Sequence, residues 1–163
     1  MLTSTPTDHL KLDPKFISHR RIALVVSRFN TEVTESLRQG ALKTFVEFGF
    51  KPEQIITRWV PGAFEIPFVA KQLAQTKKYH GIVTLGCVIR GDTPHFEYVC
   101  QGASMGCMTA ALDTNVPMTF GVITVNTPEQ ACVRSQDNEF NKGREAAIAL
   151  LDVMQTVEKE RWD

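Results

Sequence analysis

Short runs of β-branched and other apolar residues alternate with helical patterns from residue 20 onward, and this alternation constrains the fold most strongly. The first run, residues 22–26, is apolar throughout, as expected for a strand buried on both faces. Further runs cover residues 55–60, 82–89 and 118–124. Strands separated by helices form βαβ units with right-handed crossovers. The sequence therefore predicts an α/β protein with a parallel sheet and helices on both faces.

The helices are predicted from apolar spacing. Val33, Leu37, Ala41 and Phe45 recur every four residues after the first strand, and Gly49 can end this helix. Phe64, Phe68, Val69 and Leu73 mark the helix after the second strand. In the last helix, which is expected to start near Lys142, the residues predicted to face inward are Ala146, Ala149, Leu150, Val153, Met154 and Val157.

Two helix starts are predicted from capping residues. Thr93 is expected to cap a helix whose first residue is Pro94 and which ends near residue 112. Thr127 and Gln130 form the pattern of a capping box around Pro128. Both helices therefore begin just after a predicted strand.

The chain length favours one domain. A chain of 163 residues is too short for two ordinary domains. Residues 1–19 are polar, contain Pro6 and Pro14, and are expected to form a tail. Residues 20–163 are then a single domain.

The charge balance argues against several classes of partner. Lys plus Arg and Asp plus Glu both number 18, so no basic field favours nucleic acid. No apolar run is long enough to span a membrane, and the N-terminus lacks the apolar core of a signal peptide. None of the four cysteines forms a C-x-x-C pair, which favours reduced thiols and a cytoplasmic protein.

Common nucleotide, nucleophile and metal signatures are absent from the sequence. There is no G-x-G-x-x-G, no phosphate-binding lysine loop and no G-x-S-x-G elbow. No His, Cys and Asp residues have the spacing of zinc ligands. We therefore expect no cofactor and no metal.

The loops after the strands are the places to look for a site, because parallel sheets bind ligands at the carboxyl ends of their strands. The loop at residues 90–95 precedes a helix start, where free N–H groups and the dipole favour an anion. It is equally compatible with a capped helix start and nothing more. Arg90 could add positive charge to this loop or could point away from it.

Five other side chains near these loops each allow two interpretations. His95 can transfer protons near neutral pH or can be an ordinary surface histidine. Glu65 can cap a helix or accept hydrogen bonds from a polyol, and Phe29 fits the core better than a stacking surface for a flat ring. Arg134 and Lys142 can be solvated charges or can together bind a phosphate.

Three ordered segments resemble signatures of the lumazine synthase family. The first is VPGAFEIP at residues 60–67, and the second is GCVIRGDTPHFEYV at residues 86–99. The third comprises FGVIT from residue 120, EQA from residue 129 and NKG from residue 141, followed by EAA. The resemblance extends in one register from about residue 20 to the C-terminus.

The resemblance implies a fold and a reaction. The fold is a flavodoxin-like three-layer α/β/α sandwich with a four-stranded parallel sheet, and the N-terminal tail is free to add a strand to a neighbouring subunit. The reaction is a transferase step of riboflavin biosynthesis. It condenses 5-amino-6-(D-ribitylamino)uracil with 3,4-dihydroxy-2-butanone 4-phosphate, giving 6,7-dimethyl-8-ribityllumazine, phosphate and water without cofactor or metal. The alternatives on the same fold are a non-catalytic lumazine or flavin carrier and a shell protein.

The same resemblance implies the site residues. His95 matches a general acid/base, Phe29 would stack on the pyrimidine, Glu65 would bind the ribityl chain and Arg134 would bind phosphate. The full set of implied substrate-binding residues is Phe29, Ala63, Phe64, Glu65, Cys87, Val88, Ile89, Asp92, Thr93, Phe120, Arg134 and Lys142.

The resemblance further implies self-association into pentamers. Phe120, Arg134 and Lys142 would then reach the site from the neighbouring subunit. Residues 135–140 read SQDNEF, where many relatives carry a GTKAG-like run in a segment involved in shell assembly. Pentamers are therefore the prediction, and their closure into an icosahedral shell stays open.

Overall fold

The computed structural model describes residues 3–160. In chain order the elements are α1 (Pro14–Ser18), β1 (Ile22–Ser27), α2 (Thr31–Glu47), η1 (Pro52–Gln54), β2 (Ile55–Val60), η2 (Ala63–Glu65), α3 (Ile66–Gln75), β3 (Gly81–Ile89), α4 (His95–Thr114), β4 (Met118–Val125), α5 (Pro128–Ser135) and α6 (Lys142–Glu160). The four predicted strands are present, with β2 as predicted and each of the other three longer by one residue.

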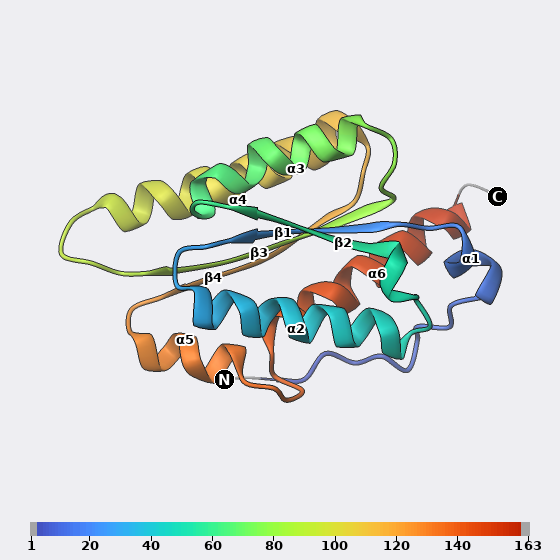
Figure 1. Ribbon diagram of the computed structural model, residues 1–163, viewed down its shortest axis with the longest axis horizontal. Helices are drawn as coiled ribbons and strands as arrows, with labels where there is room; N and C mark the ends of the chain where they lie inside the picture. Colours follow the sequence, from blue (N-terminus) through green and yellow to red (C-terminus); the bar gives the residue numbers. More distant parts are fainter. Residues whose placement is uncertain (1–2, 161–163) are drawn as a thin grey trace.

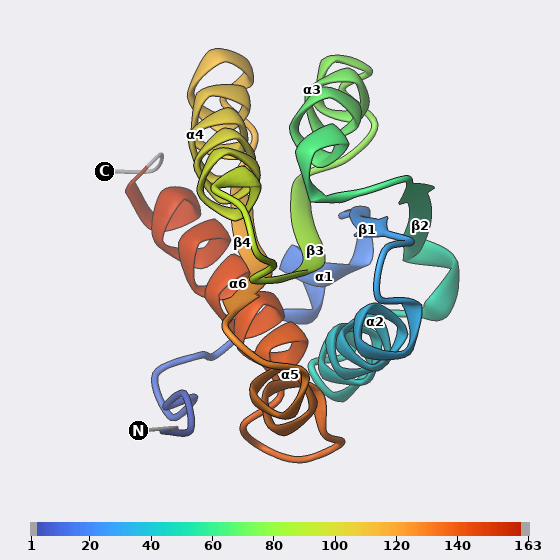
Figure 2. The same cartoon turned by 90° about the vertical axis from the view of Figure 1, so that its left-hand side faces the viewer.

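The strands form one parallel sheet in the order β2-β1-β3-β4 (Figure 1). Ile22 of β1 lies opposite Ile55 and Gly81, and Ile82 lies opposite Met118. Helices α3 and α4 cover one face, and α2, α5 and α6 cover the other (Figure 2). This confirms the predicted three-layer α/β/α sandwich and brings the carboxyl ends of all strands to one edge.

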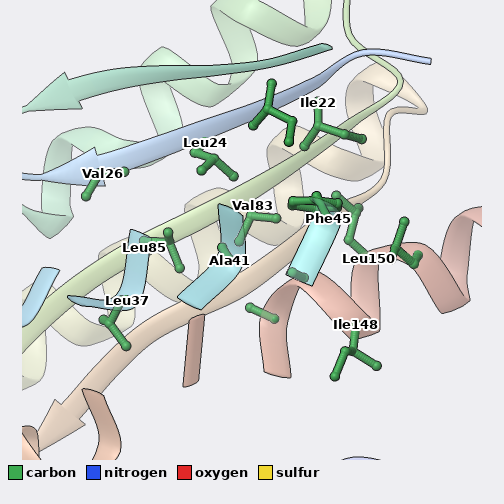
Figure 3. Packing of buried hydrophobic residues seen from close by; sticks show 14 of the residues in the cluster. Ile22, Leu24, Val26, Leu37, Ala41, Phe45, Val83, Leu85, Ile148 and Leu150 are labelled. Atoms are coloured by element: carbon green, nitrogen blue, oxygen red, sulfur yellow. The ribbon is translucent and has the colours of Figure 1, made fainter. Parts of the chain in front are cut away.

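Alternate residues of the sheet enter two separate parts of the core. Leu24 and Val26 of β1 pack toward α2 and α6, together with Leu37, Phe45 and Leu150 (Figure 3). All five side chains are fully buried. The predicted helix after the first strand is therefore confirmed, including the face that it presents to the sheet.

Two of the apolar residues that mark the predicted helix after the second strand do not face the core. Phe64 and Phe68 are 60% and 69% exposed, and the residues that α3 buries are Ile66, Ala70 and Ala74. The small alanines let α3 lie close to the sheet and to α4, so the larger phenylalanines are turned outward.

The predicted inward face of α6 is partly wrong. Val153 and Val157 are exposed, whereas Ala146, Leu150 and Met154 are buried as predicted. The buried stripe is centred on residues that include Ala147 and Leu151, and the two valines lie at its margin.

Helices α2 and α6 approach closely at the start of α6. An added Cβ at Gly143 would overlap the carbonyl oxygen of Leu37 and lie 2.6 Å from its carbonyl carbon. The Asn141 side chain accepts hydrogen bonds from the backbone N–H groups of Gly143 at 2.9 Å and Arg144 at 3.1 Å. Its amide donates to the carbonyl of Ser135 at 2.9 Å. Asn141 therefore caps α6 and ties it to the end of α5.

Residues 3–19 pack against their own chain. Leu10, Phe16 and Ile17 are buried, and the last two belong to α1, a helix that the sequence does not predict. The backbone N–H of Lys11 donates to Gln155 Oε1 at 3.1 Å. Within the described residues, 3–13 form no strand. The addition of a strand to a neighbouring subunit stays a prediction.

Candidate active site

A cavity of about 370 Å³ opens at the carboxyl edge of the sheet. In Figure 1 this edge of the sheet is on the left. The cavity is formed by the loops that follow β1, β2 and β3 and by the first turns of α4. Eight of the predicted site residues line it: Phe29, Ala63, Phe64, Cys87, Val88, Ile89, Thr93 and His95. These loops are three of the four that the strand pattern singled out.

The loop after β1 presents an aromatic ring to this cavity. The backbone N–H groups of Arg28 and Phe29 donate to the carbonyls of Val60 at 2.8 Å and Pro61 at 3.1 Å. Asn30 adopts a left-handed backbone with φ of 58° and donates from its side chain to the Cys87 carbonyl at 2.9 Å. Phe29 is left 73% exposed, so its assignment to the core is wrong. The ring is free to stack on a flat ligand.

The loop after β2 is closed by Glu65. Its Oε2 accepts a hydrogen bond from the Gly62 N–H at 2.9 Å, which caps the short helix η2. Glu65 is exposed and does not line the cavity, although Ala63 and Phe64 do. The capping interpretation therefore holds for one carboxylate oxygen, and the second oxygen makes no hydrogen bond within residues 3–160.

His95 is the first residue of α4 and is exposed at the cavity. Its backbone N–H points to Thr93 Oγ1, 3.4 Å away. Pro94 precedes the helix instead of being its first residue, so the predicted start is displaced by one residue. Asp92 is exposed and lies outside the cavity lining. The N-terminal end of α4 thus faces the cavity with its free N–H groups.

Arg90 makes contacts with protein groups around this loop. Its guanidinium pairs with Glu97, donates from Nε to Asn126 Oδ1 at 3.0 Å and lies 4.2 Å above the Phe96 ring. The hydrogen bond from Arg90 lowers the pKa of the Glu97 carboxyl. The guanidinium is thus engaged with neighbouring side chains in the described chain.

Cys87 lines the cavity as a neutral thiol. Burial raises the pKa of this thiol to about 11, so it stays protonated at neutral pH. Its carbonyl is held by Asn30, which fixes the end of β3 against the loop after β1. This environment suits a residue that shapes the cavity and does not suit a nucleophile.

Besides Glu65 and Asp92, three more predicted site residues lie outside the cavity of a single chain. Phe120 is partly exposed on the edge strand β4, and Lys142 pairs with Glu145 at 2.5 Å. Arg134 is on α5 and donates to the Gln130 carbonyl at 3.0 Å. Helix α5 and helix α4, which carries His95, cover opposite faces of the sheet (Figure 2). The isolated chain therefore does not bring Arg134 and Lys142 to the cavity.

Some lining residues were missed by sequence reasoning. They are Asn30, Gly62, Gly91, Phe96 and Val99. Phe96 and Val99 follow His95 at positions that face the same side of α4, which helical spacing could have shown. The role of Asn30 depends on a left-handed backbone and a contact with β3, neither of which the sequence reveals.

Two other kinds of feature are absent from the described part of the chain. Among residues 3–160, no three His, Cys, Asp or Glu side chains are grouped so that they could hold a metal ion. In the same range no helix is both long and apolar enough to cross a membrane.

Comparison with known proteins identifies the family. Residues 19–158 match the family described as 6,7-dimethyl-8-ribityllumazine synthase. A protein of that name from Coxiella burnetii is 48% identical over 141 residues, covering 85% of this chain and 93% of its own length. The 6,7-dimethyl-8-ribityllumazine synthase 1 of Caulobacter vibrioides is 50% identical, with 86% and 92% covered, and that of Thermus thermophilus is 46% identical, with 85% and 88% covered. The chain therefore belongs to the 6,7-dimethyl-8-ribityllumazine synthase family.

Proposed function

We propose that this chain is a transferase of riboflavin biosynthesis that condenses 5-amino-6-(D-ribitylamino)uracil with 3,4-dihydroxy-2-butanone 4-phosphate. The products are 6,7-dimethyl-8-ribityllumazine, phosphate and water. The observation that carries the proposal is the cavity at the carboxyl edge of the sheet, which both Phe29 and His95 line in a member of this family. No observation favours the carrier or the shell protein. Turnover of both substrates by the purified chain, compared with the spontaneous reaction, tests the proposal.

The pyrimidine substrate is assigned to the part of the cavity beside Phe29. The exposed ring offers a stacking surface, and the backbone of Ala63 and of residues 87–89 offers hydrogen bonds to the ring edge. The ribityl chain would extend toward Glu65, whose second carboxylate oxygen is available to accept from a hydroxyl. These roles follow the family resemblance and agree with the geometry of the loops.

The phosphate-bearing substrate is assigned to the start of α4. Thr93 and the backbone around Asp92 lie at a helix N-terminus, where free N–H groups and the helix dipole stabilise an anion. Neither Arg134 nor Lys142 of the same chain lines the cavity at this point. We infer that Arg134 of a neighbouring subunit supplies the positive charge.

The chemistry requires orientation and proton transfer. The amine of the pyrimidine attacks the ketone, and protons must move as the imine forms, phosphate leaves and the second ring closes. We assign the exchange of these protons to His95, which lines the cavity and whose side chain can transfer protons near neutral pH. Orientation can contribute ~7–11 kcal/mol, and one general acid/base about 10²–10⁴-fold, so holding the two substrates together accelerates the reaction more than proton transfer does.

We further infer that the chain forms pentamers and that each site is shared between two subunits. Large apolar side chains are exposed near and along α3 and α4, a pattern typical of a contact surface. They are Phe64, Phe68, Tyr98, Met105, Met108 and Leu112. Phe120, Arg134 and Lys142 would complete the site of the neighbour.

We infer that closure of the pentamers into a shell depends on the segment that connects α5 and α6. Asp137 pairs with Lys43 of α2, and Asn141 holds the segment to the end of α5. The segment is thus attached to its own subunit.

We place the enzyme in the cytoplasm, in keeping with its four free cysteines.

Replacing Arg134 by alanine is expected to raise the KM for the phosphate-bearing substrate by about tenfold or more, because a charge-assisted bond to phosphate contributes ~1.5–3 kcal/mol. The KM for the pyrimidine should change little. Steady-state rates with each substrate varied in turn measure both values. Unchanged saturation by the phosphate-bearing substrate would refute the assignment of Arg134.

Sharing of the site between subunits predicts complementation. Oligomers of Arg134→Ala and of His95→Ala are each impaired, but mixed oligomers should contain some sites with both wild-type residues. The two variants are unfolded together, refolded as a mixture and assayed beside each variant refolded alone. Activity of the mixture above the mean of the two separate samples supports a shared site, whereas the mean itself would show that both residues act within one subunit.

A further inference from the structure

Arg90 lies where three segments at the mouth of the cavity meet. Its backbone N–H donates to the Val125 carbonyl at 2.9 Å, which continues the pairing of β3 with β4. Its side chain reaches Asn126 after β4 at 3.0 Å, pairs with Glu97 in the first turn of α4 and covers the Phe96 ring at 4.2 Å. One side chain thus connects the end of β3, the start of α4 and the loop that leads to α5.

The groups that Arg90 contacts belong to the cavity wall or adjoin it. Phe96 lines the cavity beside His95, and Glu97 is the next residue. Arg90 precedes the loop at residues 91–94 and Glu97 follows it, so their ion pair connects the two ends of this loop. Asn126, the other partner of Arg90, is fixed by a hydrogen bond from its backbone N–H to Gln130 Oε1 of α5 at 2.8 Å. These contacts therefore fix the loop and the first turn of α4 relative to the start of α5.

These contacts are better suited to setting a position than to stabilising the fold. The Arg90 and Glu97 side chains are 43% and 52% exposed, and ion pairs at such exposure contribute little to stability. A guanidinium that forms hydrogen bonds in its plane and stacks through its face has a narrowly defined geometry. Loss of Arg90 should accordingly move the loop without unfolding the protein.

We propose that Arg90 is a positioning residue that fixes the loop at residues 91–94 and the first turn of α4, and so sets the affinity for the phosphate-bearing substrate. The proposal rests on the proposed function for the identity of that substrate. Arg90 acts through Phe96, Glu97 and Asn126. The pyrimidine substrate is held by other loops, so the effect falls mainly on one of the two substrates.

The kinetic test compares Arg90→Met with Arg90→Lys and with a matched control. Arg90→Met should raise the KM for the phosphate-bearing substrate about tenfold, below the ~10²-fold cost of a misplacement of about 1 Å. It should leave the KM for the pyrimidine nearly unchanged. Arg90→Lys should recover part of the loss, because lysine keeps the charge but lacks the planar fork. The control Lys71→Met removes a similarly exposed ion pair with Asp113, between α3 and the far end of α4, and should change neither KM.

Two further measurements make the outcome independent of turnover and of folding. Amide hydrogen exchange at residues 91–99 should be faster in Arg90→Met than in the wild-type chain, and thermal midpoints should match those of Lys71→Met.

Glu97→Gln combined with Arg90→Met should raise the KM no more than Arg90→Met alone, as expected for two partners of one contact. Unchanged exchange, or equal rises of both KM values with a lower thermal midpoint, would overturn the positioning role. A wild-type chain without turnover would count against the proposed function alone, and the exchange comparison would still decide the role of Arg90.

Discussion

Replacing His95 by alanine is expected to lower kcat about 10²-fold while leaving turnover above the spontaneous reaction, the lower end of what one general acid/base contributes. The reaction survives in part because the cavity still orients two substrates that react unaided. The loss should appear in kcat more than in either KM, since His95 is assigned to proton transfer. Steady-state rates with each substrate varied in turn separate these quantities.

The control for His95 is His80→Ala. His80 lies at the amino end of β3, on the opposite edge of the sheet, and its ring accepts a hydrogen bond from the Arg21 N–H at 3.1 Å. This variant should retain its kcat. Within the described residues the imidazole of His95 makes no hydrogen bond, so His95→Ala should keep the thermal midpoint of the wild type. An unchanged kcat in a folded His95→Ala protein would remove the acid/base role.

Replacing Gly143 by alanine is expected to destabilise the fold by about 3 kcal/mol, at the upper end of ordinary overpacking penalties. The added methyl group would meet the backbone of Leu37 in α2, with the carbonyl carbon at 2.6 Å and the Cα at 2.9 Å. No side-chain rotation can relieve a clash with helix backbone, so α2 and α6 must separate. The clash also outweighs the ~1 kcal/mol by which alanine favours a helix over glycine.

Thermal or denaturant unfolding measures this effect. A loss of about 3 kcal/mol corresponds to a fall of roughly 6–12 °C in the thermal midpoint for a domain of this size. Gly91→Ala is the matched control, because no heavy atom beyond its two chain neighbours lies within 4 Å of the Cβ it would add. Its midpoint should stay close to that of the wild type. An equal or higher midpoint for Gly143→Ala would contradict the close packing of α2 and α6.

The strands could be predicted because their signal is local. Residues 22–26 are apolar without interruption, and the shortness of the run and its β-branched residues favour a strand covered on both faces. The face of α2 was equally clear, since Leu37, Ala41 and Phe45 bury completely. The start of α5 followed from Thr127, whose hydroxyl accepts from the Gln130 N–H at 3.3 Å as the capping pattern requires.

The outward faces could not be predicted, because an apolar residue in the sequence does not show whether it packs in the core or lies on the surface of the chain. Phe64 and Phe68 have the spacing of core residues, yet both are exposed in the chain. Phe29 was assigned to the core for the same reason. In α6 the spacing defines a stripe but not its centre, which depends on packing against β3 and α2, and this places Val153 and Val157 at the margin.

The candidate site also contains some residues that local sequence could predict and others that it could not. Residues close in sequence to the strand ends, such as Ala63, Cys87 and His95, follow from the rule that ligands bind at the carboxyl edge, and they line the cavity. Arg90 carried two open interpretations, and its contacts with Glu97 and Asn126 became visible only when three segments were brought together. Arg134 and Lys142 lie outside the cavity of one chain, so their roles depend on a second subunit.

The most direct measurement of the central proposal is turnover by the purified chain. The protein is mixed with 5-amino-6-(D-ribitylamino)uracil and 3,4-dihydroxy-2-butanone 4-phosphate, and the lumazine product is followed by its absorbance and fluorescence. The same mixture without protein gives the spontaneous rate, and the mass of the assembly is measured on the same sample. We predict product formation well above the spontaneous rate and proportional to protein concentration. The spontaneous rate alone, in a folded sample of pentameric or larger mass, would contradict it and favour a carrier or a shell protein.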